Sequence, residues 1–107
     1  MSAFTVHDLE KRVRERAAAS ADASYTRKLL DRGVAYCAKK LGEEAVEAVL
    51  AAAVEDRERV IAESADLIYH LLVVLRARDI SLAEVEAELA LRVKTSGLEE
   101  KASRKPD

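Results

Sequence analysis

Two pairs of acidic residues, each with members three positions apart, are the features of this sequence best suited to chemistry. Glu44 and Glu47 form one pair, and Glu63 and Asp66 form the other. At about 100° per residue, the members of a pair fall on one flank of an α-helix. Four converging carboxylates would repel one another unless a cation balanced their charge. Oxygen ligands favour Mg²⁺, with Mn²⁺ as a substitute, so the pattern predicts metal-assisted phosphate chemistry.

Other polar residues lie close to these pairs. Glu43 adjoins Glu44, and Lys40 shares the flank of Glu44. Lys40 can hold a phosphate or pair with Glu44 one turn away. His70 shares the flank of the second pair. For this residue, a role in orienting its neighbours or in packing is favoured over a role as a metal ligand. Acidic pairs at this spacing also occur on solvated helix faces, and 20 acidic residues make chance pairs common.

The elements that must position these residues are helices. Ala, Glu, Leu, Arg and Lys dominate, and three Gly and one Pro leave little turn chemistry for a β-sandwich. We predict an all-α fold, a four-to-five-helix antiparallel bundle within a single domain, residues 1–107. The short connection around Asp56 predicts that two long helices run antiparallel, so that the acidic pairs face each other. We expect a first helix to begin at Thr5 and a last helix to begin at Ser81. Between them, helical segments are expected at 24–33, 34–54 and 57–78.

The two long helices each carry an apolar stripe beside the acidic flank. The first stripe is expected at Val34, Ala38, Leu41, Ala45, Ala48 and Ala52; the second is expected at Val60, Ser64, Leu67, Leu71 and Leu75. In residues 71–75, apolar side chains occur almost all round the helix, which predicts that a second copy covers part of them in a homodimer. Residues 98–107 offer few apolar anchors and are expected to form a mobile tail.

Composition argues against several functional classes. The net charge is −2, from 18 basic and 20 acidic residues, so we expect neither nucleic acid nor a membrane surface as a partner. The N-terminus has no apolar signal core, and no apolar run approaches the roughly 20 residues of a membrane span, so a cytoplasmic location is expected. The single cysteine, Cys37, excludes an internal disulfide and is expected to be a core residue.

Three segments together resemble one enzyme family. They are Ser24–Leu30 (SYTRKLL), Lys40–Glu47 (KLGEEAVE) and Glu63–His70 (ESADLIYH). They are similar to the phosphoribosyl-ATP pyrophosphatases, which belong to the all-α nucleoside-triphosphate pyrophosphatase (MazG-like) superfamily. The superfamily signature is two acidic residues, two spacers and a third acidic residue, followed later by Glu-x-x-Asp. The residues that match it are Glu43, Glu44, Glu47, Glu63 and Asp66.

The resemblance implies hydrolysis of phosphoribosyl-ATP to phosphoribosyl-AMP and pyrophosphate, the second step of histidine biosynthesis, by a homodimer. It implies Mg²⁺ ligands at Glu44, Glu47, Glu63 and Asp66, with Glu43 orienting or deprotonating the attacking water. Lys40, Arg27 and Lys28 would neutralise phosphate charge. Two alternatives remain: a house-cleaning nucleoside-triphosphate pyrophosphatase of the same superfamily, and a non-enzymatic helical dimerisation module.

Overall fold

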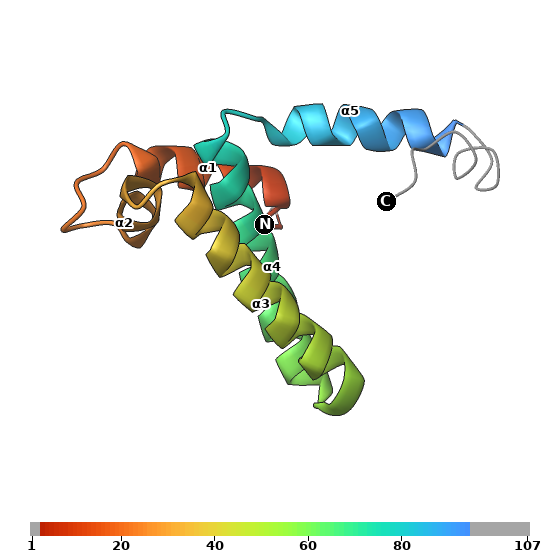
Figure 1. Cartoon of the computed structure of the whole chain (residues 1–107). Coiled ribbons are helices and arrows are strands. Elements are labelled where there is room, and N and C mark those ends of the chain that lie inside the picture. The colour runs from red at the N-terminus through yellow and green to blue at the C-terminus, as the bar shows by residue number, and fades with distance from the viewer. Residues whose placement is uncertain (1–2, 95–107) are drawn as a thin grey trace.

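The computed structural model describes residues 3–94, which form five α-helices with no strand among them (Figure 1). In chain order the helices are α1 (Val6–Ala17), α2 (Tyr25–Asp31), α3 (Val34–Val54), α4 (Arg57–Ala77) and α5 (Leu82–Val93). The all-α prediction is confirmed, and the expected boundaries of the long helices agree with the structure to within one residue. The expected tail, 98–107, lies outside the described residues.

Four of the five helices begin where a side chain caps them. Thr5 and Ser81 each form a capping box with the acidic residue three positions on, and the Ser24 hydroxyl accepts from the Arg27 amide. At the start of α3 the residue is Gly33, with φ +93°, a conformation that glycine adopts most easily. These local signals explain why the sequence alone located the helix starts.

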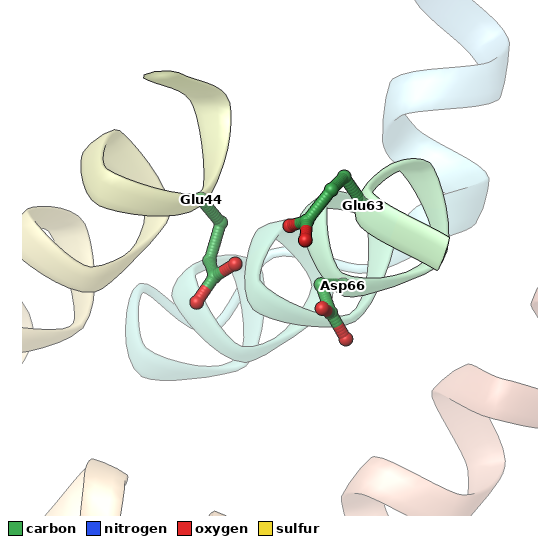
Figure 2. Close-up of side chains that lie close together, drawn as sticks. All are labelled: Glu44, Glu63 and Asp66. Carbon is green, nitrogen blue, oxygen red and sulfur yellow. The ribbon is translucent and has the colours of Figure 1, made fainter. Parts of the chain in front are cut away.

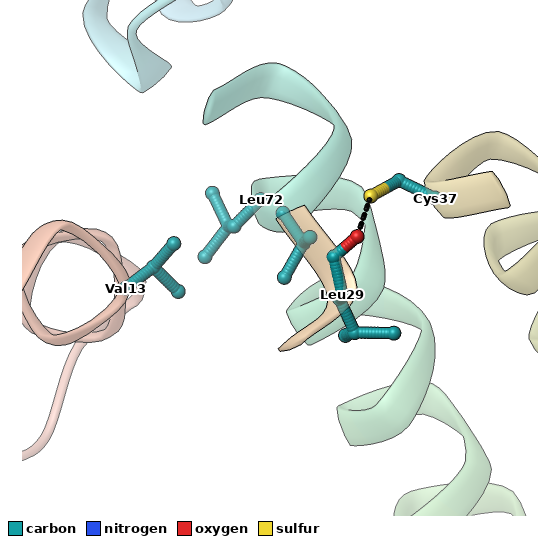
Figure 3. Packing of buried hydrophobic residues seen from close by; sticks show 5 residues of the cluster. Val13, Leu29, Cys37 and Leu72 are labelled. Carbon is teal, nitrogen blue, oxygen red and sulfur yellow. Dashed lines mark hydrogen bonds between the residues drawn. The ribbon is translucent and has the colours of Figure 1, made fainter. Parts of the chain in front are cut away.

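The core lies where α1 and α2 meet the start of α3 and the second half of α4 (Figure 3). It consists of Val13, Leu29, Cys37, Leu72 and Val73, which are all buried. The Cys37 thiol donates to the Leu29 carbonyl at 3.2 Å, and burial raises the pKa of the thiol. Cys37 is therefore a core residue, as the sequence predicted.

Helices α3 and α4 form an antiparallel hairpin that projects from this core (Figure 1). Their contact faces agree only in part with the apolar stripes that the sequence predicted, because Leu41 and Ala48 on α3 and Leu67 on α4 are half-buried but other members are not. On α3, Val34 and Ala52 are exposed, whereas Ala51 is completely buried. On α4, Leu71 is 39% exposed, whereas Glu63 and His70, which lie outside the predicted stripe, are buried. Both helices are thus rotated so that part of each acidic flank enters their shared interface.

Helix α5 extends away from the other helices and contains no buried residue (Figure 1). Its first turn is tied to α1, because the Leu82 amide donates to Glu10 at 2.6 Å and His7 lies 2.8 Å from Glu86. Among the described residues, no helix combines the length and apolar character needed to cross a membrane. The second half of α5 leaves Leu89, Leu91 and Val93 more than half exposed to solvent.

Candidate metal centre

Three of the predicted carboxylates meet in the middle of the α3–α4 hairpin (Figure 2). Glu44 comes from α3, and Glu63 and Asp66 come from α4. One carboxylate oxygen from each residue lies within 4.8 Å of the others. The antiparallel arrangement places residues of the two acidic pairs opposite each other, as the short connection at Asp56 predicted.

Two oxygens of this cluster are buried without a partner. Within residues 3–94, neither Glu44 Oε2 nor Glu63 Oε2 has a hydrogen-bond partner, although both atoms are inaccessible to solvent. Buried polar atoms in native proteins are almost always satisfied, and an unsatisfied carboxylate oxygen is costly. A divalent cation between the three residues would satisfy both atoms, and a donor set made only of carboxylate oxygens suits Mg²⁺.

The electrostatics of the cluster also fit a cation. Burial raises the pKa of Glu44, and the neighbouring carboxylates of Glu47, Asp66 and Glu63 raise it further. Burial likewise raises the pKa of Glu63, with Arg59 acting in the opposite direction and Glu47 and Asp66 adding to the increase. The protein without metal therefore holds negative charge here at an energetic cost that a cation would remove.

Arg59 is a member of the site that the sequence analysis missed. Its guanidinium donates to Glu63 Oε1, and it also contacts Glu55 at 3.4 Å. Its backbone amide donates to Asp56, the N-cap of α4. The spacing of four residues between Arg59 and Glu63 is a pairing signal that could have revealed it. Arg59 binds one oxygen of Glu63 and leaves the other facing the cluster.

Lys40 pairs with Glu43 rather than with Glu44, the partner considered from the sequence. The distance from Lys40 Nζ to Glu43 Oε1 is 3.1 Å, and this pairing raises the pKa of Lys40. Glu43 is thus engaged with Lys40 beside the three clustered carboxylates. Glu47 is exposed at the edge of the cluster, close enough to raise the pKa values of both Glu44 and Glu63.

The other basic candidates lie on α2. Arg27 bonds to Asp31 at 2.8 Å and donates to the carbonyls of Ala17 and Ala19. These bonds hold the connection between α1 and α2, so Arg27 has a structural task in this conformation. Lys28 is exposed on the same helix.

His70 is buried beside the cluster, with Nε2 3.8 Å from Glu44 Oε1, which is beyond hydrogen-bond distance. Burial and then the charge of Lys40 lower the pKa of His70. The Tyr69 ring makes an edge contact with the imidazole, and the Tyr69 hydroxyl hydrogen-bonds to Thr26 on α2 at 2.5 Å. These contacts join α2 to the segment of α4 that directly follows Asp66.

Comparisons with known proteins agree on one family. A family model described as phosphoribosyl-ATP pyrophosphohydrolase matches residues 6–93. A protein of Bradyrhizobium diazoefficiens named phosphoribosyl-ATP pyrophosphatase 1 is 62% identical over 105 residues, covering 98% of this chain and 99% of its own length. A protein of the same name from Rhodopseudomonas palustris is 57% identical and matches over the full length of both chains. One from Nitrobacter winogradskyi named phosphoribosyl-ATP pyrophosphatase is 58% identical over 107 residues.

Proposed function

The chain belongs to the phosphoribosyl-ATP pyrophosphohydrolase family, and on that premise we propose that it hydrolyses phosphoribosyl-ATP to phosphoribosyl-AMP and pyrophosphate. This reaction is the second step of histidine biosynthesis. The observation that carries the proposal is the end-to-end similarity to proteins of that name, at 57–62% identity. The cluster of facing carboxylates supplies the chemistry that such a reaction needs.

Glu44, Glu47, Glu63 and Asp66 are the proposed ligands of Mg²⁺. When bound, the ion would polarise the phosphoanhydride and offset the charge of the leaving pyrophosphate. The buried, unpartnered oxygens of Glu44 and Glu63 support this ligand set. Glu47 is exposed at the edge of the cluster, a position from which a small movement would complete the set.

The neighbouring charged residues have proposed roles in handling phosphate and water. Lys40 neutralises phosphate charge, and its pairing with Glu43 keeps it protonated and directed along the same flank. When a substrate phosphate replaces Glu43 as the partner of Lys40, Glu43 is released to orient or deprotonate the attacking water. Arg27 and Lys28 are the second source of positive charge; Arg27 would have to leave its present bonds to reach a phosphate.

A product assay tests the proposed function. With Mg²⁺, the protein is expected to release pyrophosphate and phosphoribosyl-AMP from phosphoribosyl-ATP, and to release much less pyrophosphate from ordinary nucleoside triphosphates. Mass analysis of the products distinguishes cleavage between the α and β phosphates from loss of the γ phosphate. Equal turnover across a panel of triphosphates would instead favour a house-cleaning pyrophosphatase.

We also propose that the chain acts in the cytoplasm as one domain that forms a homodimer. Large apolar side chains remain exposed along the outer surface of the hairpin, including Val49 at 66%, Leu50 at 53% and Leu71 at 39%. On α5, Leu89 and Leu91 are more than half exposed. Exposed apolar surface on this scale is typical of an interface, and a second copy of the same chain would cover it.

Disrupting this surface is expected to yield monomers. Leu50→Lys places a charge among the exposed apolar residues of α3, so it should oppose association without filling or emptying the core. Light scattering at micromolar concentration should show a dimer for the unmodified chain and a monomer for the variant. Glu15→Lys, on an exposed position of α1, is the matched control and should remain dimeric. A stable monomer of the unmodified chain would contradict the proposal.

A further inference from the structure

An apolar cleft lies directly beside the carboxylate cluster. Its volume is about 370 Å³, and it lies between the start of α1 and the outer face of α4. Phe4, Val6 and Leu9 form one wall, and Ile68 and Tyr69 form part of the other. The volume falls within the range of about 300–1,000 Å³ that is usual for ligand pockets, which are mainly apolar with a few polar groups.

Asp66 connects the two sites. It contributes one carboxylate oxygen to the cluster, and it also lines the cleft. A molecule in the cleft would therefore place one of its ends at the carboxylates. In a nucleotide, a single ribose separates the base from the α phosphate. A base in the cleft would thus leave the α phosphate close to Asp66, where the proposed reaction occurs.

We propose that this cleft binds the purine ring of the nucleotide substrate. The proposal rests on the proposed function, which supplies the nucleotide. The ring would lie between the apolar side chains of Phe4 and Ile68. Removing the ring and these side chains from water would favour binding. Phe4 is 66% exposed in the described structure and so is free to cover a ligand.

The charge of the cleft selects among the parts of the substrate. Among residues 3–94, Asp66 is the one charged residue that lines the cleft, and no described lysine or arginine does so. A phosphate group there would meet a carboxylate and an apolar surface, which is unfavourable. The triphosphate and the phosphoribosyl phosphate are therefore excluded from the cleft, and the base is the part of phosphoribosyl-ATP that fits it.

Binding measurements with two simple probes test this assignment. AMP carries the base and one phosphate, whereas inorganic pyrophosphate engages only the carboxylate and phosphate-binding region. By calorimetry with Mg²⁺, Phe4→Ala and Ile68→Ala should each weaken AMP binding about tenfold, as expected for the loss of a contact to a base. Both should leave the affinity for pyrophosphate unchanged within about a factor of two. Val54→Ala, which truncates an exposed apolar residue at the far end of the hairpin, should change neither affinity.

Kinetic measurements separate this inference from the proposed function. Phe4→Ala should raise the KM for phosphoribosyl-ATP about tenfold, with a much smaller change in kcat. If the unmodified protein does not hydrolyse phosphoribosyl-ATP, the proposed function fails, but the comparison of AMP with pyrophosphate still decides the cleft. Equal effects on AMP and pyrophosphate, or no effect on either, would overturn the assignment. Conversion of the dimer to monomers by Phe4→Ala would also overturn it, because the cleft would then be an interface between copies.

Discussion

Asp66→Asn and Glu47→Gln are each expected to lower kcat/KM for Mg²⁺-dependent pyrophosphate release by about 100- to 1,000-fold. A metal ion supplies several kcal/mol of charge stabilisation in the transition state, and about 1.4 kcal/mol corresponds to a factor of ten. Each substitution removes one negative ligand while keeping the size of the side chain. Both residues are exposed, so the fold should survive, with a stability change of at most about 0.5 kcal/mol.

A double mutant and a matched control sharpen this test. If both residues bind the same ion, the double mutant should lose little more activity than either single mutant, because groups that act as a unit are not additive. Glu58→Gln, at an exposed position in the first turn of α4, removes a charge of the same kind outside the cluster. It should keep full activity. Normal pyrophosphate release by both Asp66→Asn and Glu47→Gln would refute the site.

Mg²⁺ is expected to stabilise the unmodified protein strongly, and Glu44→Gln should remove most of that effect. At a free Mg²⁺ concentration about 100 times the Kd, binding to the native state alone adds roughly 2.7 kcal/mol. For a domain of this size that gain corresponds to a rise in Tm of roughly 10–20 °C at fixed protein concentration. Without metal, Glu44→Gln should itself raise the Tm, because it removes one charge from a partly buried cluster of like charges.

The pH dependence of the metal-free protein follows from the same residues. The native pKa values of Glu44 and Glu63 lie above the ordinary value of 4.5. Between 4.5 and those raised values the native state holds more protons than the unfolded chain, so the free energy of unfolding falls as pH rises through this window. Mg²⁺ binds the deprotonated carboxylates, so its affinity should weaken as pH falls through the same window.

Thermal unfolding with and without Mg²⁺, repeated at several pH values, checks these expectations. Glu58→Gln is again the control, and it should keep both the Mg²⁺-dependent rise in Tm and the pH dependence. A Mg²⁺ effect on the Tm that survives unchanged in Glu44→Gln would contradict binding at this cluster. So would a metal-free protein whose stability increases with pH across the window.

Local sequence signals determined the helices and their boundaries. The capping residues Thr5, Ser24 and Ser81 satisfy backbone amides within a few positions of themselves, so neighbouring residues alone specify where these helices start. The spacing within each acidic pair fixes its members to one helical flank for the same reason. The short connection at Asp56 constrains the direction of α4 relative to α3. Fold class and the facing of the two pairs were therefore predictable.

Only the tertiary structure decided how far each helix turns about its axis. Apolar residues occur on more than one side of α3, so more than one stripe could have faced α4. The predicted stripe included Val34 and Ala52, but packing buries Cys37 and Ala51 and leaves Val49 outside. The sequence pattern cannot distinguish an apolar side chain that contacts α4 from one that stays exposed on the outside of the hairpin.

That rotation determined the chemistry of the site. It takes Glu44 and Glu63 from the flank, where the sequence placed them, into the interface between α3 and α4, and it leaves Asp66 exposed at the edge. Within α3 itself, Lys40 pairs with Glu43 three residues on rather than with Glu44. Residue spacing predicted that the carboxylates of each pair share one flank of a helix, because helical periodicity is local. Their burial, their raised pKa values and the neighbouring cleft depend on packing between distant segments, which only the folded chain defines.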